Sequence, residues 1–197
     1  TINKTNIYNN CYLKLNMKKL KNIILLSKNS HRGIINSSVE MPLESTGYLI
    51  KIKKENKYYI SNIYTIQTAI RTPTSVCYGN EQAIKRLRKL EDVWTNNNYY
   101  IGGFHSHIAS RNIEKNKLSE EDLDFISKEM KKMKKKEWLE IILTLEPKKY
   151  LKNRKVGEVI CKKKNKLNCR IYDEPKHGYL ATFSAYLINS DFKAKSI

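Results

Sequence analysis

The chain has 197 residues, of which 40% are hydrophobic and 29% are charged, a balance that excludes a disordered polymer and allows one domain with a buried core. Lysine and arginine number 38 against 19 aspartate and glutamate residues, which gives a formal net charge of +19. Because the lysines are spread over nearly all segments, the charge indicates a solvated surface more than a dedicated site for a polyanion. Nothing resembles a signal peptide or a membrane span, so we expect a cytoplasmic protein without a membrane partner.

The first half of the chain predicts an extension followed by short strands and two helical segments. Residues 1–20 are polar and rich in asparagine and lysine, which indicates an N-terminal extension or an edge strand before a domain over 21–197. The pattern then predicts a strand or short helix, a helical turn, two antiparallel strands and an amphipathic helix. These elements are expected at 21–27, 31–39, 47–52, 57–67 and 80–94.

The second half predicts one more helix among several strands. A strand over 99–107 is followed by a helix from Ser119 to about Lys135. Ser119 is suited to the N-cap position, and the acidic residues after it suit the positive end of a helix. Further strands are expected at 138–145, 155–162, 166–172 and 179–188, and Pro147 is expected to end the first of these. No linker between them is long enough to require a second domain.

The four cysteines do not indicate a structural metal cluster. They lie at Cys11, Cys77, Cys161 and Cys169, without C-x-x-C spacing. Cys161 and Cys169 could face each other across a hairpin, but we expect reduced, half-buried thiols in a cytosolic protein.

Two of the four histidines form the segment Phe104-His105-Ser106-His107, which indicates a metal-ligand pair. Histidines at i and i+2 point to the same face of a strand, whereas Ser106 points to the opposite face. Asp122, in the first turn of the following helix, can supply a third ligand and leave a fourth position open for water, as in catalytic zinc sites. Asp124 is the alternative third ligand. The remaining histidines, His31 and His177, are expected at the surface.

A zinc hydrolase also needs a group that takes a proton from water and passes it to the leaving group, and a glutamate usually does this. Glu44 lies just before the predicted strand that starts at Gly47, where glycine allows close approach of a neighbouring element. If this strand and the histidine strand belong to one sheet, Glu44 lies beside the metal. Glu40 is the rival residue.

In this order, Glu44-x-x-Gly47, His105-x-His107 and Ser119-x-x-Asp122 resemble the JAMM metalloproteases, also called the JAB or MPN+ domain. The glycine-containing strand that leads into His105 adds to the likeness, which covers roughly residues 20–145. The resemblance implies an α+β fold of the α/β/α JAB/MPN type, with a mixed, mainly antiparallel sheet flanked by helices and one zinc site.

The resemblance also implies a role for each residue of the motif. His105, His107 and Asp122 would bind Zn²⁺ with a water as the fourth ligand, Glu44 would be the general acid and base, and Ser119 would help to stabilise the oxyanion. The chain departs from the family pattern in two ways. Ile108 replaces the usual proline after the second histidine, and the spacer over 108–118 is longer than is customary. The proline is not a ligand, so its loss should not abolish the chemistry.

The implied activity is that of a zinc-dependent peptidase or isopeptidase that hydrolyses the bond after the C-terminal tail of ubiquitin or a ubiquitin-like protein. The compact domain indicates a prokaryotic-type JAB domain, and in bacteria such domains often work beside ubiquitin-activating and conjugating-like enzymes. Two other hypotheses stay open: a non-catalytic scaffold of the same fold, and a basic nucleic-acid-associated protein. No nucleic-acid-binding motif supports the last of these.

Overall fold

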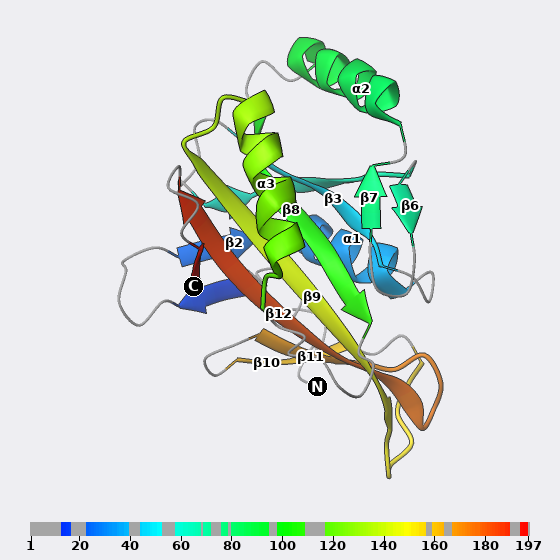
Figure 1. Ribbon diagram of the computed structural model, residues 1–197. Coiled ribbons are helices and arrows are strands. Elements are labelled where there is room, and N and C mark those ends of the chain that lie inside the picture. Colours follow the sequence, from blue (N-terminus) through cyan, green and yellow to red (C-terminus); the bar gives the residue numbers. More distant parts are fainter. Residues whose placement is uncertain are drawn as a thin grey trace.

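The structure is a computed structural model, and it describes residues 13–16, 23–39, 44–52, 58–67, 69–71, 76–78, 80–94, 98–108, 117–156, 159–163, 167–189 and 194–196. Over these residues the chain has an α+β fold with three helices and a mixed, mainly antiparallel sheet (Figure 1). None of the described helices is both long enough and apolar enough to cross a membrane.

The helices and strands have the following bounds. The helices are α1 (Lys28–Val39), α2 (Glu81–Trp94) and α3 (Glu120–Lys132). The strands are β1 (Leu13–Asn16), β2 (Ile23–Leu26), β3 (Thr46–Ile52), β4 (Tyr59–Ile60), β5 (Asn62–Thr65), β6 (Ala69–Arg71), β7 (Val76–Tyr78), β8 (Asn98–Ile108), β9 (Glu137–Lys149), β10 (Val159–Lys163), β11 (Leu167–Ile171), β12 (His177–Asn189) and β13 (Ala194–Ser196).

The large sheet has eight described strands. Its order is β10-β11-β12-β9-β8-β3-β5, and β13 also pairs with β12. Strands β8 and β9 run parallel, and the other described pairs of this sheet run antiparallel. A parallel pair needs a crossover connection, and α3 lies in the segment that links β8 to β9. The crossover therefore brings the first turn of α3 back over the sheet.

Both faces of the large sheet are buried. Successive side chains of a strand point to opposite faces, so neighbouring residues of one strand enter two different cores. One core contains Leu49 and Phe104 together with Ile34 of α1. The other contains Tyr48 and Ile142 together with residues of α2 and α3. In Figure 1, α3 lies in front of the sheet and α1 lies behind it. The predicted α+β arrangement, a mixed and mainly antiparallel sheet flanked by helices, is confirmed.

Glycines allow the central strands to approach closely. A Cβ at Gly47 would lie 2.3 Å from the carbonyl oxygen of Tyr64, on the neighbouring strand β5. A Cβ at Gly102 would lie 1.7 Å from the carbonyl oxygen of Leu139, on β9. The expectation that Gly47 admits a neighbouring element is therefore confirmed, and any larger residue at either position would push the sheet apart.

Several expected boundaries were wrong. The strand over 57–67 is divided into β4, which pairs with β2, and β5, which pairs with β3. Helix α1 begins at Lys28, earlier than expected, since Ser27 Oγ accepts a hydrogen bond from the backbone of Ser30 at 3.0 Å and caps the helix. Strand β9 continues through Pro147 to Lys149. Strand β8 pairs with β9 only as far as Leu145, so the missing N–H of Pro147 interrupts no β8–β9 pairing.

Cys169 forms a disulfide, so the expectation of a reduced thiol was wrong for this residue. Cys161 is its register partner across β10 and β11, as the hairpin interpretation predicted. Cys11 lies outside the described residues.

Candidate metal centre

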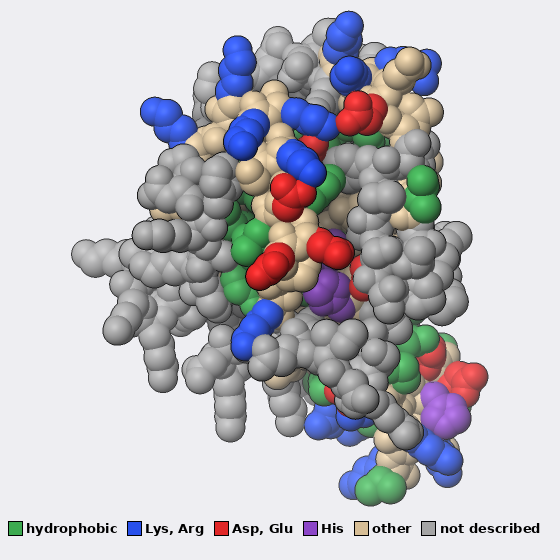
Figure 2. All heavy atoms as spheres, in the orientation of Figure 1, with side chains coloured by type: hydrophobic (Ala, Val, Ile, Leu, Met, Phe, Trp, Pro, Cys, Tyr) green, Lys and Arg blue, Asp and Glu red, His purple; other side chains and the backbone are tan. Residues whose placement is uncertain are grey.

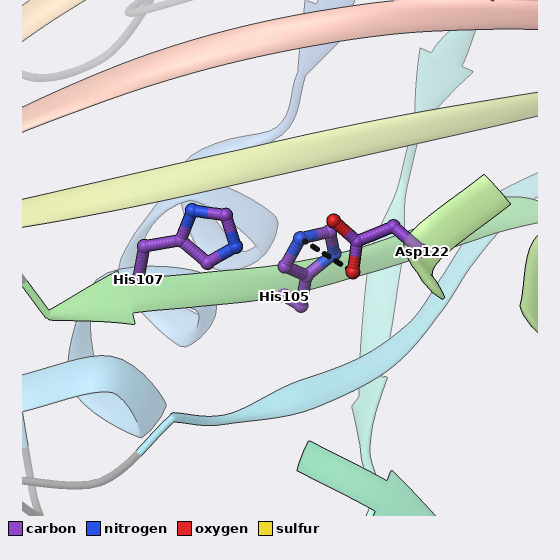
Figure 3. Close-up of side chains that lie close together, drawn as sticks. All are labelled: His105, His107 and Asp122. Carbon is purple, nitrogen blue, oxygen red and sulfur yellow. Dashed lines mark ion pairs between the residues drawn. The ribbon is translucent and has the colours of Figure 1, made fainter. Parts of the chain in front are cut away.

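Three candidate ligands come together where β8 meets the start of α3. His105 and His107 lie on β8, and Asp122 lies in the first turn of α3. One ligand atom from each of the three lies within 4.8 Å of the others. Figure 3 shows the two imidazoles projecting from the same strand, with the carboxylate of Asp122 against His105. Two imidazoles and one carboxylate are a donor set that suits zinc and leaves a coordination position open.

Ser106 points to the opposite face of β8, as expected, and it connects this strand to β3. Its side chain is buried, and its Oγ accepts a hydrogen bond from the backbone N–H of Ser45 at 2.8 Å. The backbone N–H of Ser106 donates to the carbonyl oxygen of Ser45 at 2.8 Å. These bonds fix the start of β3, and therefore the neighbouring Glu44, relative to the two histidines.

Asp122 is oriented by the cap of its own helix. Ser119 is the N-cap, and its Oγ accepts a hydrogen bond from the backbone N–H of Asp122 at 3.0 Å. In return, Asp122 Oδ2 accepts from the backbone N–H of Ser119 at 2.8 Å. The other oxygen, Oδ1, lies 3.6 Å from Nε2 of His105. The capping box therefore holds one carboxylate oxygen and leaves the other facing the histidine.

His105 has the surroundings of a metal ligand. Its Nδ1 lies 2.8 Å from Oε1 of Glu140, whereas its Nε2 is buried without a hydrogen-bond partner. Leaving such an atom unsatisfied is costly, and a cation between Nε2 and Asp122 would remove the cost. Burial alone would lower the pKa of His105. The hydrogen bond to Glu140 and the charges of Glu140, Asp122 and Glu44 outweigh it, so the pKa is raised.

Glu44 lies beside these residues and is 7% exposed. Burial raises its pKa to about 7; the charge of His105 acts in the opposite direction, and the charge of Asp122 raises the pKa further. Thr46, two residues after Glu44, is the register partner of His105 across β3 and β8. The two strands are adjacent, which was the condition for Glu44 to lie at the candidate site. The rival Glu40 lies outside the described residues.

The surroundings of the candidate centre differ in charge from the chain as a whole. On the face drawn in Figure 2, acidic side chains lie around a histidine near the middle of the view, with lysine and arginine side chains both beside them and toward the edges. The first turn of α3 contributes Glu120, Glu121 and Asp122. These carboxylates favour a cation at the start of α3.

The other candidate residues lie elsewhere. Asp124 is exposed and forms an ion pair with Lys128 at 2.6 Å, so the structure favours Asp122 as the third ligand. His177 is exposed, as expected, and Nδ1 lies 2.9 Å from Oε2 of Glu174. His31 is half-buried on α1 against Phe183, which corrects the expectation of a surface position. Burial and the charge of Arg32 lower the pKa of His31 to about 4.

Glu140 was missed in the sequence. It lies within the apolar run Trp138-Leu139-Glu140-Ile141-Ile142 of β9 and is 4% exposed. A carboxylate in a strand that is buried on both faces needs a partner, because burial without one is very costly. A glutamate within a strand that is otherwise apolar is therefore the feature of the sequence that indicates a buried partner for Glu140.

We expect zinc affinity to fall as the pH falls, because zinc binding requires both imidazoles to be unprotonated. The pKa of His105 is raised above its ordinary value of 6.5, so protons begin to compete at a higher pH than for an ordinary histidine. Below this pKa the affinity should drop about tenfold per pH unit for each proton displaced. A competition titration with a chromophoric chelator between about pH 5 and pH 8 measures this. A flat affinity over that range would contradict the ligand role of His105.

Comparisons with known proteins give no family. No family model matches the chain, and no curated protein matches it. Among solved structures, the chain is similar to the solution structure of protein DSY2949 from Desulfitobacterium hafniense, with 16% sequence identity and a TM-score of 0.49. The match covers 87% of this chain and 88% of that chain. Function is therefore inferred from the geometry of the site itself.

Proposed function

We propose that this protein is a zinc-dependent peptidase or isopeptidase of the JAMM type, with a JAB/MPN fold. Its substrate would be the bond after the C-terminal tail of ubiquitin or a ubiquitin-like protein. The observation that carries the proposal is the meeting of His105, His107 and Asp122 beside the buried Glu44. These residues lie on β8, on α3 and just before β3, and their order along the chain is that of the JAMM motif.

The three ligands would hold Zn²⁺ through two imidazole nitrogens and one carboxylate oxygen. When bound, the ion would lower the pKa of a coordinated water and polarise the carbonyl of the scissile bond. The buried Nε2 of His105, which lacks a hydrogen-bond partner, supports the fit of a cation at this place.

Glu44 would act as the general base and then as the general acid. A catalytic group works best when its pKa lies near the operating pH, and burial raises the pKa of Glu44 to about 7. Its carboxylate would take a proton from the attacking water and deliver a proton to the leaving nitrogen. A neighbouring cation would favour the ionised form of Glu44, which is the form that accepts the proton.

Ser119 would donate a hydrogen bond to the developing oxyanion. Its Oγ already accepts a hydrogen bond from the backbone N–H of Asp122, so the hydroxyl proton remains available for donation. The side chain is exposed at the start of α3, next to the ligand Asp122. Capping and oxyanion stabilisation therefore use different parts of the same hydroxyl group.

The tail of the modifier would bind in an extended conformation. Strand β5 is the last strand in the described order of the large sheet, next to β3. Its residue Thr65 is the register partner of Gly47, three residues after Glu44. An extended peptide that pairs with an exposed strand edge gains main-chain hydrogen bonds, and such pairing would lead the scissile bond toward Glu44.

We expect the purified protein to bind one equivalent of Zn²⁺ and to cleave a fusion whose amino-terminal part is a ubiquitin-like protein. A chelator should abolish cleavage and added zinc should restore it. His107→Ala should lose both metal and cleavage, because it removes one of three ligands. His177→Ala, which changes an exposed histidine, is the matched control and should keep both.

The outcomes of this experiment separate the competing hypotheses. Zinc binding without cleavage of any modifier fusion would favour a scaffold of the same fold. Absence of zinc binding would contradict the metallopeptidase proposal altogether. Binding to DNA or RNA at physiological salt, with affinity that falls steeply as salt rises, would favour the nucleic-acid hypothesis.

A further inference from the structure

We propose that Glu140 is a positioning residue of the metal centre, which holds His105 with its proton on Nδ1 and so presents Nε2 to the cation. The inference rests on the metal-dependent function proposed above. It adds a sixth position, on β9, that the JAMM motif quoted for this chain does not include.

The hydrogen bond between the two residues determines which nitrogen of His105 carries the proton. His105 Nδ1 lies 2.8 Å from Oε1 of Glu140. An ionised carboxylate only accepts hydrogen bonds, so the imidazole must donate through Nδ1–H. In the neutral ring Nε2 then carries a lone pair, and this is the atom that faces Asp122. A metal-binding histidine commonly donates its other ring N–H to a carboxylate in this way, which fixes the tautomer and makes the ligand more basic.

The carboxylate of Glu140 is itself fixed. The indole N–H of Trp138 can only donate, and it donates to Oε2 of Glu140 at 2.7 Å. This leaves Oε1 directed at His105. On the neighbouring strand, Gly103 is the register partner of Glu140, and a Cβ there would lie 2.8 Å from Oε2. The absence of a side chain at Gly103 therefore makes the room that the carboxylate occupies.

The parallel pairing of β8 and β9 places these residues on one face. Glu140 is opposite Gly103, two residues before His105, and the pairing continues with Ile142 opposite His105. Trp138 and Ile142 belong to the apolar core under α3. The carboxylate and the imidazole therefore meet in a dry environment, where their hydrogen bond is stronger than it would be in water.

The first test uses the unmodified, metal-free protein. At a pH where His105 is neutral, its ring nitrogens are examined by ¹⁵N NMR. We expect the proton on Nδ1 and an unprotonated Nε2. A proton on Nε2 would overturn the proposal, and this result does not depend on zinc binding or on cleavage.

The second test compares two buried glutamates. Glu140→Gln keeps the shape but removes the charge, and its NH₂ group must face either the indole N–H or the imidazole N–H. Zinc affinity should fall by about 10-fold to 100-fold, the usual effect of losing such a partner. Glu129 lies on α3, is 1% exposed, and accepts a hydrogen bond from the hydroxyl group of Tyr48 at 2.8 Å. Glu129→Gln should bind zinc within about twofold of the wild type, because Glu129 is not one of the candidate ligands.

The readouts distinguish this proposal from the proposed function. Zinc affinity of Glu140→Gln within about twofold of the wild type would overturn the role of Glu140, even if the enzyme cleaves its substrate. A wild-type protein that fails to bind zinc would contradict the metallopeptidase proposal, and the tautomer of His105 would then show only whether Glu140 orients this imidazole. If Glu140→Gln fails to fold, the measurement on the unmodified protein decides the matter.

Discussion

Replacing Glu44 by glutamine is expected to abolish cleavage while zinc binding is retained. Glutamine has nearly the same shape but cannot take up a proton, so the attacking water would lose its base. General acid–base catalysis typically contributes about 10²-fold to 10⁴-fold, and kcat should fall by that amount. The zinc stoichiometry should stay at one, because the three ligands do not include Glu44. Single-turnover cleavage of a modifier fusion, together with metal analysis of the same sample, makes the measurement.

Glu129→Gln serves as the control for the loss of a buried carboxylate, because Glu129 is also buried but belongs to α3 and bonds to Tyr48. It should keep cleavage within a few-fold of the wild type. Full activity of Glu44→Gln would exclude Glu44 as the base and would return attention to Glu40. An inactive variant that has also lost zinc would contradict the expectation that Glu44 can be changed independently of the metal.

The ligand arrangement follows local patterns that the sequence displays directly. His105 and His107 share a face because a strand alternates its side chains, and the alternation also sends Ser106 to the other face. Asp122 lies at the third position after an N-cap serine, where a helix start directs a short carboxylate back toward the cap. Each of these relations spans only a few residues, so neighbouring residues suffice to predict them.

Relations between distant segments were harder to predict. The approach of Glu44 to the histidines depends on the pairing of β3 with β8, and the role of Glu140 depends on the pairing of β8 with β9. A shift of one residue in either pairing would turn the side chains to the opposite face. The residues near Glu140 in the sequence do not predict which residue of β8 it faces. The close approaches at Gly47 and Gly102 help to set these pairings, but a glycine in the sequence does not predict which residue will approach it.

The errors in element boundaries have a similar origin. Pro147 ends a strand only if the backbone there must donate to a neighbour, and β8 has already ended its pairing with β9 at Leu145. The division of the segment after Tyr58 arises because β4 pairs with β2 whereas β5 pairs with β3. Local alternation predicts extended backbone in both cases, but the partners of the strand determine where it breaks or continues.

Ser119 is expected to contribute to catalysis beyond its role as a helix cap. Ser119→Ala removes both functions. The free energy of unfolding should fall by about 1 kcal/mol because the cap is lost. The kcat should fall by about 10²-fold to 10³-fold because the oxyanion donor is lost. Ser119→Thr keeps a hydroxyl at the same place, so it should keep both the cap and most of the activity. Thermal unfolding and steady-state kinetics of the zinc-loaded proteins report the two roles separately.

Ser119→Asp separates the two roles of this residue, because aspartate caps a helix about as well as serine but, when ionised, has no proton to donate to an oxyanion. Its side chain can still accept the hydrogen bond that Asp122 N–H now gives to Ser119 Oγ. We expect this variant to unfold near the wild-type temperature, to bind one zinc, and to show a reduced kcat. If it retains full activity, Ser119 acts as a cap that orients Asp122, and the oxyanion must be stabilised by other groups.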